Sequence, residues 1–420
     1  MSGPELITLG CRLNAAESET MRMLARDEDD LVIVNSCAVT AEAVSRTRQA
    51  IRRAKRARPD ARIMVTGCAA QIEPERFAAM PEVSRVIGNS HKHDATSFRR
   101  SDRPSPFGIA DKVRVSDIMA VRETAPHLVS GFAEHTRAFV EVQNGCDHRC
   151  TFCVIPFGRG NSRSVPAGLV IDRIKALVDE GISEIVLTGV DMTSYGPDLP
   201  GTQSLGHLVE RILTHVPALP RLRLSSIDSV EVDARLFDLV TSSDRIMPHL
   251  HLSLQAGDDM ILKRMKRRHS RAQAVEMIAR LKAARPAIAI GADLIAGFPT
   301  ETEDMAENSL KLIDDCDIVF AHIFPYSPRA GTPAARMPQV DPRVAKERAR
   351  RLREAATVRR AAWLQSLVGS VQTVLIERGA RGHAENFAEV RFDGPTGDAG
   401  EIGAMRIVSA ASDHLVGVPA

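Results

Sequence analysis

The residues best suited to chemistry are cysteines, and six of the seven fall into two sets of three. The compact set lies within one stretch, NGCDHRCTFCVIPFGRG, with the spacing C-x3-C-x2-C. Its members are Cys146, Cys150 and Cys153. The start of the chain lacks the basic and apolar regions of a secretory signal, so we expect a cytoplasmic protein whose thiols serve metal or redox chemistry rather than disulfides.

The dispersed set is spread over the N-terminal region, where each member follows an apolar run typical of a buried strand. The runs ELITLG, LVIVNS and RIMVTG lead into Cys11, Cys37 and Cys68. The patterns predict strands at 5–9, 31–35, 62–66 and 83–87, alternating with helices at 13–26, 41–58 and 71–79. This order is typical of a parallel sheet. Ligands of such sheets gather beyond the carboxyl ends of the strands, so the three thiols should converge there.

Three cysteines on a four-iron cluster leave one iron open, and an open iron can bind a substrate. Structural zinc usually has four ligands in two pairs, and no fourth cysteine or histidine stands at a suitable spacing. His148 lies inside the compact set but is more simply an orienting or solvent-facing residue. The alternative for the dispersed set is three buried structural cysteines. Cys316 is interpreted as a core thiol without a role.

A second alternating series indicates six strand-helix units, fewer than the eight of a closed barrel, and predicts an open barrel. Its strands are expected at 138–143, 184–189, 221–225, 249–254, 288–294 and 317–323, and its helices at 168–180, 204–216, 233–242, 270–284 and 302–314. A basic helix is expected at 343–363. The compact cysteine set follows the first barrel strand, on the face where barrel active sites lie.

The fold class is therefore α/β, with several domains in a chain of 420 residues. We predict a three-cysteine parallel α/β domain, a linker or covering segment, an open barrel that includes the basic helix, and a small β-barrel. Their expected boundaries are 1–90, 91–135, 136–365 and 366–420. No apolar run is long enough to span a membrane.

The compact set, with Phe152 just before its last cysteine, resembles the signature of the radical S-adenosylmethionine enzymes. With the dispersed set included, nearly the whole chain resembles the methylthiotransferases, which combine a three-cysteine domain, a radical barrel and an RNA-binding TRAM domain. LTGVDMTSYG, SLQAGDDMILKRM, DLIAGFPTETED and FPYSPRAGTPAARMP resemble barrel motifs of that family. TLGCRLN, VNSCAVT and IPFGRGNSRS most resemble its threonylcarbamoyladenosine tRNA branch.

This resemblance implies two [4Fe-4S] clusters, each held by one cysteine set. The cluster on Cys146, Cys150 and Cys153 would cleave S-adenosylmethionine to a 5′-deoxyadenosyl radical, and the cluster on Cys11, Cys37 and Cys68 would deliver sulfur. The implied reaction inserts methylthio at C2 of N6-threonylcarbamoyladenosine, just 3′ of the anticodon, with S-adenosylmethionine supplying both the methyl group and the radical. The implied partners are a tRNA anticodon stem-loop and an electron donor such as flavodoxin or ferredoxin.

The resemblance also suggests residues that contact S-adenosylmethionine, although a packing or turn role explains each of them about as well. They are Phe152, Thr188, Gly189, Gln255, Asp293 and Gly297. Asn14 matches the family pattern and is expected to support the Cys11 loop, with a helix-starting asparagine as the alternative. His249 and His251 are interpreted as satisfied core histidines.

Charge supports an RNA partner only in part, because the net charge is +2. Segment 43–62 holds eight Arg or Lys against one acidic residue, and segment 343–363 holds eight against two. Both predict phosphate contacts, with a solvated helix face as the alternative. Residues 371–420 carry four arginines against seven acidic side chains, which is unusual for an RNA-binding module.

Three alternative functions stay open from the sequence. The nearest is a sister methylthiotransferase that acts on isopentenyladenosine in tRNA or on a ribosomal protein. The second is a non-enzymatic iron-sulfur protein that binds RNA and senses iron or oxygen. The third is a zinc-loop RNA-binding protein, which would be colourless. Turnover of S-adenosylmethionine separates the enzymes from the other two.

Overall fold

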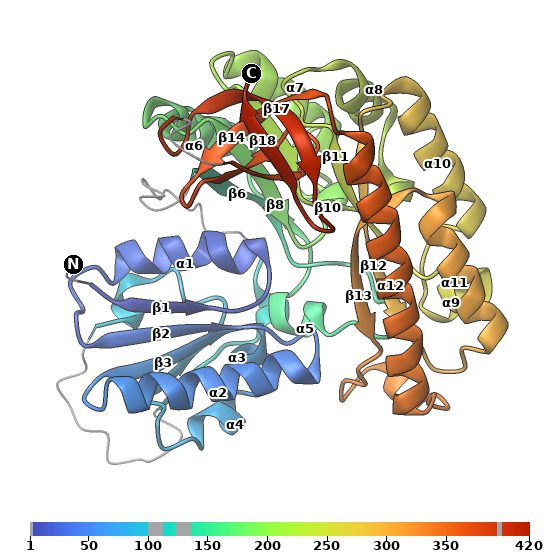
Figure 1. Cartoon of the computed structure of the whole chain (residues 1–420). Coiled ribbons are helices and arrows are strands. Elements are labelled where there is room, and N and C mark those ends of the chain that lie inside the picture. The colour runs from blue at the N-terminus through green and yellow to red at the C-terminus, as the bar shows by residue number, and fades with distance from the viewer. Residues whose placement is uncertain (1–2, 100–111, 123–135, 393–396) are drawn as a thin grey trace. The chain divides into compact units, whose positions relative to one another are not determined.

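The structure, a computed structural model, describes residues 3–99, 112–122, 136–392 and 397–420. The chain divides into two compact units, and the first comprises Met1–Ser130, Glu141–Val165 and Ser327–Thr332. The second comprises Gly131–Val140, Pro166–Tyr326 and Pro333–Ala420. Both cysteine sets therefore belong to the first unit. Figure 1 shows the elements of each unit in the colours of the chain.

The first unit is built on a parallel sheet of five strands in the order β1-β2-β3-β4-β5. The strands are β1 (Glu5–Thr8), β2 (Leu31–Ser36), β3 (Arg62–Gly67), β4 (Arg85–Ile87) and β5 (Val113–Arg114). The connecting helices are α1 (Arg12–Leu24), α2 (Ala41–Ala57), α3 (Cys68–Ile72) and α4 (Pro74–Ala78). The predicted parallel order is confirmed, and β5 comes from the segment that was expected to be a linker.

Alternating side chains of β2 explain why both faces of this sheet are covered. Val32 and Val34 belong to the same apolar core as Ile51 of α2, whereas Leu31 and Ile33 join Met21 of α1 in another core. Successive side chains of a strand point to opposite faces, so α1 and α2 cover opposite sides of the sheet. Figure 1 shows this arrangement. The sheet is buried on both faces, and its open positions lie at the strand ends.

The helix predicted at 71–79 is wrong as a single element, because α3 ends at Ile72 and α4 begins at Pro74. Glu73 between them has φ −127° and ψ 53°, outside the helical region. The ring of a proline disfavours helical geometry at the preceding residue, which accounts for the break.

The six predicted barrel strands are all present, within two four-stranded sheets ordered β7-β6-β8-β9 and β10-β11-β12-β13. Those six are β6 (Arg137–Asn144), β8 (Glu184–Gly189), β9 (Arg221–Leu224), β11 (His249–Gln255), β12 (Ala289–Ala296) and β13 (Ile318–Pro325). Two short strands, β7 (Arg163–Ser164) and β10 (Ser226–Ile227), were not predicted. The α/β fold class is confirmed.

The helices of the second unit follow the predicted ranges closely. They are α6 (Ala167–Asp179), α7 (Leu205–His215), α8 (Ala234–Ser242), α10 (Arg271–Ala284), α11 (Glu303–Asp315) and the basic helix α12 (Pro342–Ser366). Helix α9 (Asp259–Arg264) was not predicted, and Asp258 caps it by accepting hydrogen bonds from the backbone N–H groups of Met260 and Ile261. No described helix is long and apolar enough to cross a membrane.

The C-terminal strands form the predicted closed barrel, in the order β14-β15-β16-β18-β17. They are β14 (Val371–Glu377), β15 (Arg381–Ala384), β16 (Glu389–Arg391), β17 (Ile402–Ala410) and β18 (Leu415–Pro419). Arginines of β6 and β9 join this barrel to the α/β strands: Arg223 donates to the carbonyls of Ala384 and Glu385, and Arg137 pairs with Glu377. Part of the acidity of the C-terminal module is thus used inside the protein.

Candidate active site with two cysteine loops

The three cysteines of the dispersed set lie at the carboxyl edge of the first sheet. Cys11 directly precedes α1, Cys37 follows β2, and Cys68 is the first residue of α3. Gly10 packs so closely against Cys37 that residue 10 has no room for a Cβ. Short βα connections therefore bring three thiols that are distant in sequence to one edge, where three ligands for a cluster are needed.

Asn14 holds the loops of this edge together. Its Nδ2 donates to the carbonyl of Leu9 over 2.6 Å and to the carbonyl of Ser36 over 3.1 Å. In return, Asn35 Nδ2 donates to the Asn14 carbonyl over 3.0 Å. One amide thereby ties the loop before Cys11 to the loop before Cys37, which is the supporting role expected for Asn14.

The thiols differ in environment: Cys11 is exposed, Cys37 is half-buried and Cys68 is buried. Burial raises the pKa of Cys37 to about 11, so this free thiol is protonated at neutral pH. Binding to a metal replaces that proton, because the thiolate is the ligand form. The donor set, three sulfurs at one edge, fits an iron-sulfur cluster with one open iron.

The compact set lies in the loop between β6 and the short helix α5 (Ile155–Arg159). The Cys146 N–H donates to the Gly160 carbonyl over 3.0 Å, and the Cys153 N–H donates to the Cys150 carbonyl over 3.1 Å. Arg149 closes the loop from outside by donating to the Cys146 carbonyl over 2.8 Å. All three thiols are half-buried and carried by a loop with internal hydrogen bonds, a donor set that also fits a cluster.

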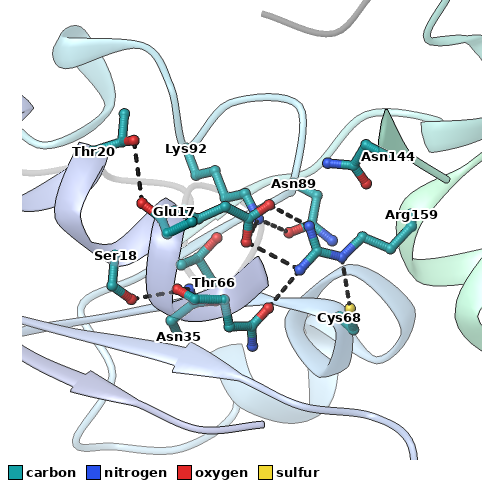
Figure 2. Close-up of polar contacts among 12 residues, drawn as sticks. Glu17, Ser18, Thr20, Asn35, Thr66, Cys68, Asn89, Lys92, Asn144 and Arg159 are labelled. Carbon is teal, nitrogen blue, oxygen red and sulfur yellow. Dashed lines mark hydrogen bonds and ion pairs between the residues drawn. The ribbon is translucent and has the colours of Figure 1, made fainter. Parts of the chain in front are cut away.

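Arg159, at the end of α5, reaches from the compact loop to the dispersed set (Figure 2). Its Nε donates to the Cys68 Sγ over 3.2 Å, and its Nη2 donates to Glu17 Oε2 over 3.0 Å. Its Nη2 also bonds Asn14 Oδ1. The preceding Gly158 packs against Cys68, where a Cβ would lie 3.1 Å from the Cys68 Cβ. One helical turn therefore connects the two cysteine loops.

The carboxylate that receives Arg159 is completely buried and also pairs with Lys92. Burial raises the pKa of Glu17, but the charges of Arg159 and Lys92 outweigh this effect and hold the pKa well below its usual range. Lys92 in turn donates to Asn89 Oδ1 over 2.8 Å, and Asn89 Nδ2 bonds the Gly158 carbonyl. These residues form a buried network of charged and polar side chains, and burying charged groups carries a large desolvation penalty.

Comparisons with known proteins are consistent with this geometry. Residues 140–313 match the Radical SAM superfamily, and residues 5–88 match a family described as uncharacterized protein family UPF0004. The chain is 50% identical over 391 residues to "Threonylcarbamoyladenosine tRNA methylthiotransferase MtaB" of Rickettsia prowazekii, covering 93% of this chain and 91% of that protein. The chain belongs to the radical S-adenosylmethionine methylthiotransferase family, in its threonylcarbamoyladenosine tRNA branch.

Other relatives lie further away. The protein of the same name from Bacillus subtilis is 34% identical and covers 98% of this chain and 94% of that protein. A "tRNA-2-methylthio-N(6)-dimethylallyladenosine synthase" of Ruegeria pomeroyi is 32% identical and covers 99% of both. Among solved structures, the radical S-adenosylmethionine methyltransferase TsrM from Kitasatospora setae matches with a TM-score of 0.52 at 17% identity, over 76% of this chain and 66% of that one. That likeness concerns the fold alone.

The S-adenosylmethionine contacts expected in this family are divided between the two units. Phe152 lies in the compact loop of the first unit, while the other five lie in the second. Thr188 is buried at the end of β8, followed by Gly189. Gln255 ends β11 with a φ of +67°, in the left-handed region. This conformation is strained for residues other than glycine, and such strained residues are often found at functional sites.

Gly297 has a packing role in the structure. Its φ is +71°, its N–H donates to Glu301 Oε2 over 2.7 Å, and a Cβ there would overlap the Ala345 Cβ of α12. The close approach of α12 therefore accounts for a glycine at this position without any ligand.

Asp293 is the centre of a triad on three neighbouring barrel strands. Its Oδ1 lies 3.0 Å from His251 Nε2 and 3.2 Å from His322 Nδ1. Burial raises the pKa of Asp293, but the hydrogen bonds from the two histidines outweigh this effect and hold the pKa well below its usual range. The other core histidine, His249, lies against the rings of Phe320 and Phe387. Both histidines thus have partners, as the sequence suggested.

Four of the eight basic side chains in segment 343–363 form ion pairs within the protein. Arg348 is buried against Glu301 and Glu303. The other paired arginines are Arg350, with Glu347 and Glu354, Arg351, with Glu303 and Glu307, and Arg359, with Asp317. Segment 43–62 is similar, because Arg46, Arg52, Arg58 and Arg62 form ion pairs. Arg53 and Arg56 are exposed and have no ion-pair or hydrogen-bond partner in the described part of the chain, as is true of the Arg343 and Lys346 side chains.

Sequence reasoning missed Glu17, Lys92 and the role of Arg159. The only signal lay in the motif IPFGRG, which places an arginine one turn after the compact set. Glu17 and Lys92 carry no local pattern that distinguishes them from surface charges.

Proposed function

We propose that this chain inserts a methylthio group at C2 of N6-threonylcarbamoyladenosine, at the nucleoside just 3′ of the tRNA anticodon. The observation that carries the proposal is the pair of three-cysteine sets within one compact unit of a chain that belongs to this family. Inserting S–CH3 at an unactivated aromatic carbon requires activation of that carbon and a separate source of sulfur. Two metal sites meet those two needs.

Cys146, Cys150 and Cys153 hold the radical-generating [4Fe-4S] cluster in this proposal. When bound, that cluster binds S-adenosylmethionine and supplies the electron that releases a 5′-deoxyadenosyl radical. The chain fixes the loop through the Cys146 and Cys153 N–H bonds and through Arg149. These contacts would support the loop that carries the three sulfurs.

Cys11, Cys37 and Cys68 would hold a second [4Fe-4S] cluster, and that cluster would supply the sulfur of the methylthio group. The convergence of the three strand ends supports this assignment, as does the buried arginine on Cys68. One S-adenosylmethionine supplies the methyl group and another supplies the radical. The contacts proposed for S-adenosylmethionine are Phe152, Thr188, Gly189, Gln255, Asp293 and Gly297.

The proposed partners follow from the substrate and the chemistry. The tRNA anticodon stem-loop is the substrate, and Arg53 and Arg56 of α2 are exposed cations suited to its phosphates. Reduction of the clusters needs a one-electron donor such as flavodoxin or ferredoxin. We assign the protein to the cytoplasm, where tRNA is modified.

The test begins with iron and labile sulfide per chain on protein reconstituted without oxygen. Dithionite, S-adenosylmethionine and tRNA are then added, and 5′-deoxyadenosine and modified nucleosides are measured. The proposal expects about eight irons per chain, 5′-deoxyadenosine, and the methylthio form of threonylcarbamoyladenosine. About four irons with cleavage would remove the sulfur-delivering site. Methylthio on isopentenyladenosine would identify the sister activity, and iron without cleavage would favour a sensor.

A further inference from the structure

The buried network beside Cys68 contains more positive than negative charge. Arg159 is 2% exposed, Lys92 is 1% exposed and Glu17 is fully buried. The single carboxylate pairs with both cations. Within the described residues, no second carboxylate contacts either cation. One positive charge is therefore left without a carboxylate in a site that water does not reach.

An uncompensated buried charge is strongly destabilising, and burial together with the nearby Arg159 lowers the pKa of Lys92. An anion beside the two cations would remove that cost. The sulfur that accepts the Arg159 Nε–H shows where that anion belongs: Cys68, 3.2 Å away. A four-iron core held by three thiolates carries a net negative charge, and a sulfide or methylsulfide on its open iron adds another. The excess cation matches that ligand in sign and position.

We propose that Arg159 is a positioning residue of the dispersed cysteine site, which it serves by holding the Cys68 sulfur and by favouring an anionic sulfur ligand there. The inference rests on the proposed function and deepens it. A cationic donor to a ligating sulfur stabilises the reduced, more negative cluster, so it raises the reduction potential. It also favours retention of an anionic group on the open iron, because the two charges attract in a low-dielectric site.

Two contacts fix the guanidinium, and two others fix the helical turn that carries it. Asn14 and Glu17 take the Nη groups, Gly158 presses α5 against Cys68, and Asn89 holds the Gly158 carbonyl. A side chain fixed from several directions loses little further entropy when the cluster binds. Helix α5 follows the compact cysteine set directly and ends at Arg159. The helix that begins after the compact set therefore also positions the hydrogen-bond donor to Cys68.

The experiment uses the full chain with Cys146, Cys150 and Cys153 changed to alanine, so that one cluster remains to be measured. Arg159→Gln removes the donor and the excess charge, and Lys92→Gln removes the excess charge but keeps the donor. Arg76→Gln is the matched control, because Arg76 is an exposed arginine of the same unit paired with Glu73. Iron content, the reduction potential followed by electron paramagnetic resonance, and binding of added methanethiolate are measured.

We expect Arg159→Gln to weaken methanethiolate binding at least tenfold and to lower the potential by a tenfold change in the reduction equilibrium, about 59 mV for one electron. Lys92→Gln should shift both in the same direction by less, and Arg76→Gln should match the parent. If Arg159→Gln does not fold, Lys92→Gln decides. An intact cluster with unchanged potential and unchanged thiolate binding in the decisive variant overturns the inference. A parent protein that holds no cluster would instead overturn the proposed function.

Discussion

Gly10 and Cys37 touch at the carboxyl edge of the first sheet: a Cβ on residue 10 would lie 2.8 Å from the Cys37 Cβ and 3.1 Å from its Sγ. Gly10 also has a φ of +102°, a conformation that L side chains rarely adopt. This contact couples the loop of one proposed cluster ligand to the side chain of another. It leads to the first prediction.

Gly10→Ala should displace Cys37, reduce iron at the dispersed site and lower the free energy of unfolding by about 2 kcal/mol. Gly181→Ala is the control, because Gly181 has a φ of +91° but nothing within 4 Å of the position that a Cβ would take. It should lose only the smaller cost of the backbone conformation and keep its iron. Equal iron loss in the two variants would show that the contact with Cys37 has no part in metal binding.

Substitutions in the two cysteine sets should have different effects on the cleavage of S-adenosylmethionine and on formation of the methylthio product. Cys146→Ala is expected to abolish both the cleavage of S-adenosylmethionine and the methylthio product. Cys37→Ala is expected to retain cleavage and lose the product, because it removes only a ligand of the proposed sulfur-delivering cluster. Assays of 5′-deoxyadenosine and of tRNA nucleosides measure both. Full product from either variant would refute the role assigned to that cysteine.

Glu184 of β8 should be essential for the stability of the second unit. It is fully buried, with its Oε1 2.9 Å from Arg223 Nε and 3.1 Å from Arg137 Nε. Glu184→Gln leaves these arginines without their charge partner, so we expect a loss of about 3 kcal/mol in the free energy of unfolding. Urea denaturation measures it. Glu389→Gln, at a partly exposed pair with Arg391, should cost less than about 1 kcal/mol.

Binding of tRNA should depend on the exposed, unpaired arginines of α2 more than on an ion-paired arginine of α12. Arg53→Gln and Arg56→Gln should each weaken binding and lower the salt slope of log K by about 1, as expected for one lost phosphate contact. Arg350→Gln should have little effect, because Arg350 already pairs with Glu347 and Glu354. Titrations at several salt concentrations provide the slopes. A larger loss with Arg350→Gln would show that ion pairing does not keep an arginine from binding tRNA.

Asp293 should contribute stability that disappears in acid. Its pKa is below the usual value in the folded state, so its contribution is complete above the unfolded value of about 3.9 and is lost as the pH falls toward the folded value. We expect Asp293→Asn to unfold more easily than the parent at about pH 6, by about 2 kcal/mol. The difference should shrink below about pH 4. A constant difference across that range would exclude titration of Asp293 as its cause.

The sequence predicted the features that have a local pattern. The apolar runs before Cys11, Cys37 and Cys68 identified strand ends, and parallel pairing then placed the thiols at one edge. Helix α9 was not predicted because it has only six residues, too few for a helical period to appear in the sequence. The break at Glu73 was available in principle, since Pro74 disfavours helical geometry there.

The pairing of the charged residues could not be predicted, for a different reason. Arg159 pairs with Glu17 across 142 residues, and Arg348 pairs with Glu303 across 45. A charge that is neutralised from a distant segment looks the same in the sequence as one that faces solvent. The sequence therefore did not show that four arginines of segment 343–363 pair with carboxylates of α11, of α12 itself and of the residues beside α11.

The position of Arg159 also bears on how such an enzyme can be inherited. Residues 141–165 belong to the same compact unit as the N-terminal sheet, although the sequence on either side belongs to the other unit. A gene fragment that encoded only the N-terminal sheet would leave Glu17 without Arg159, and one that encoded only the barrel would leave Arg159 without its acceptors. Selection would therefore act against recombination between the N-terminal sheet and residues 141–165. We expect these two segments to be inherited together.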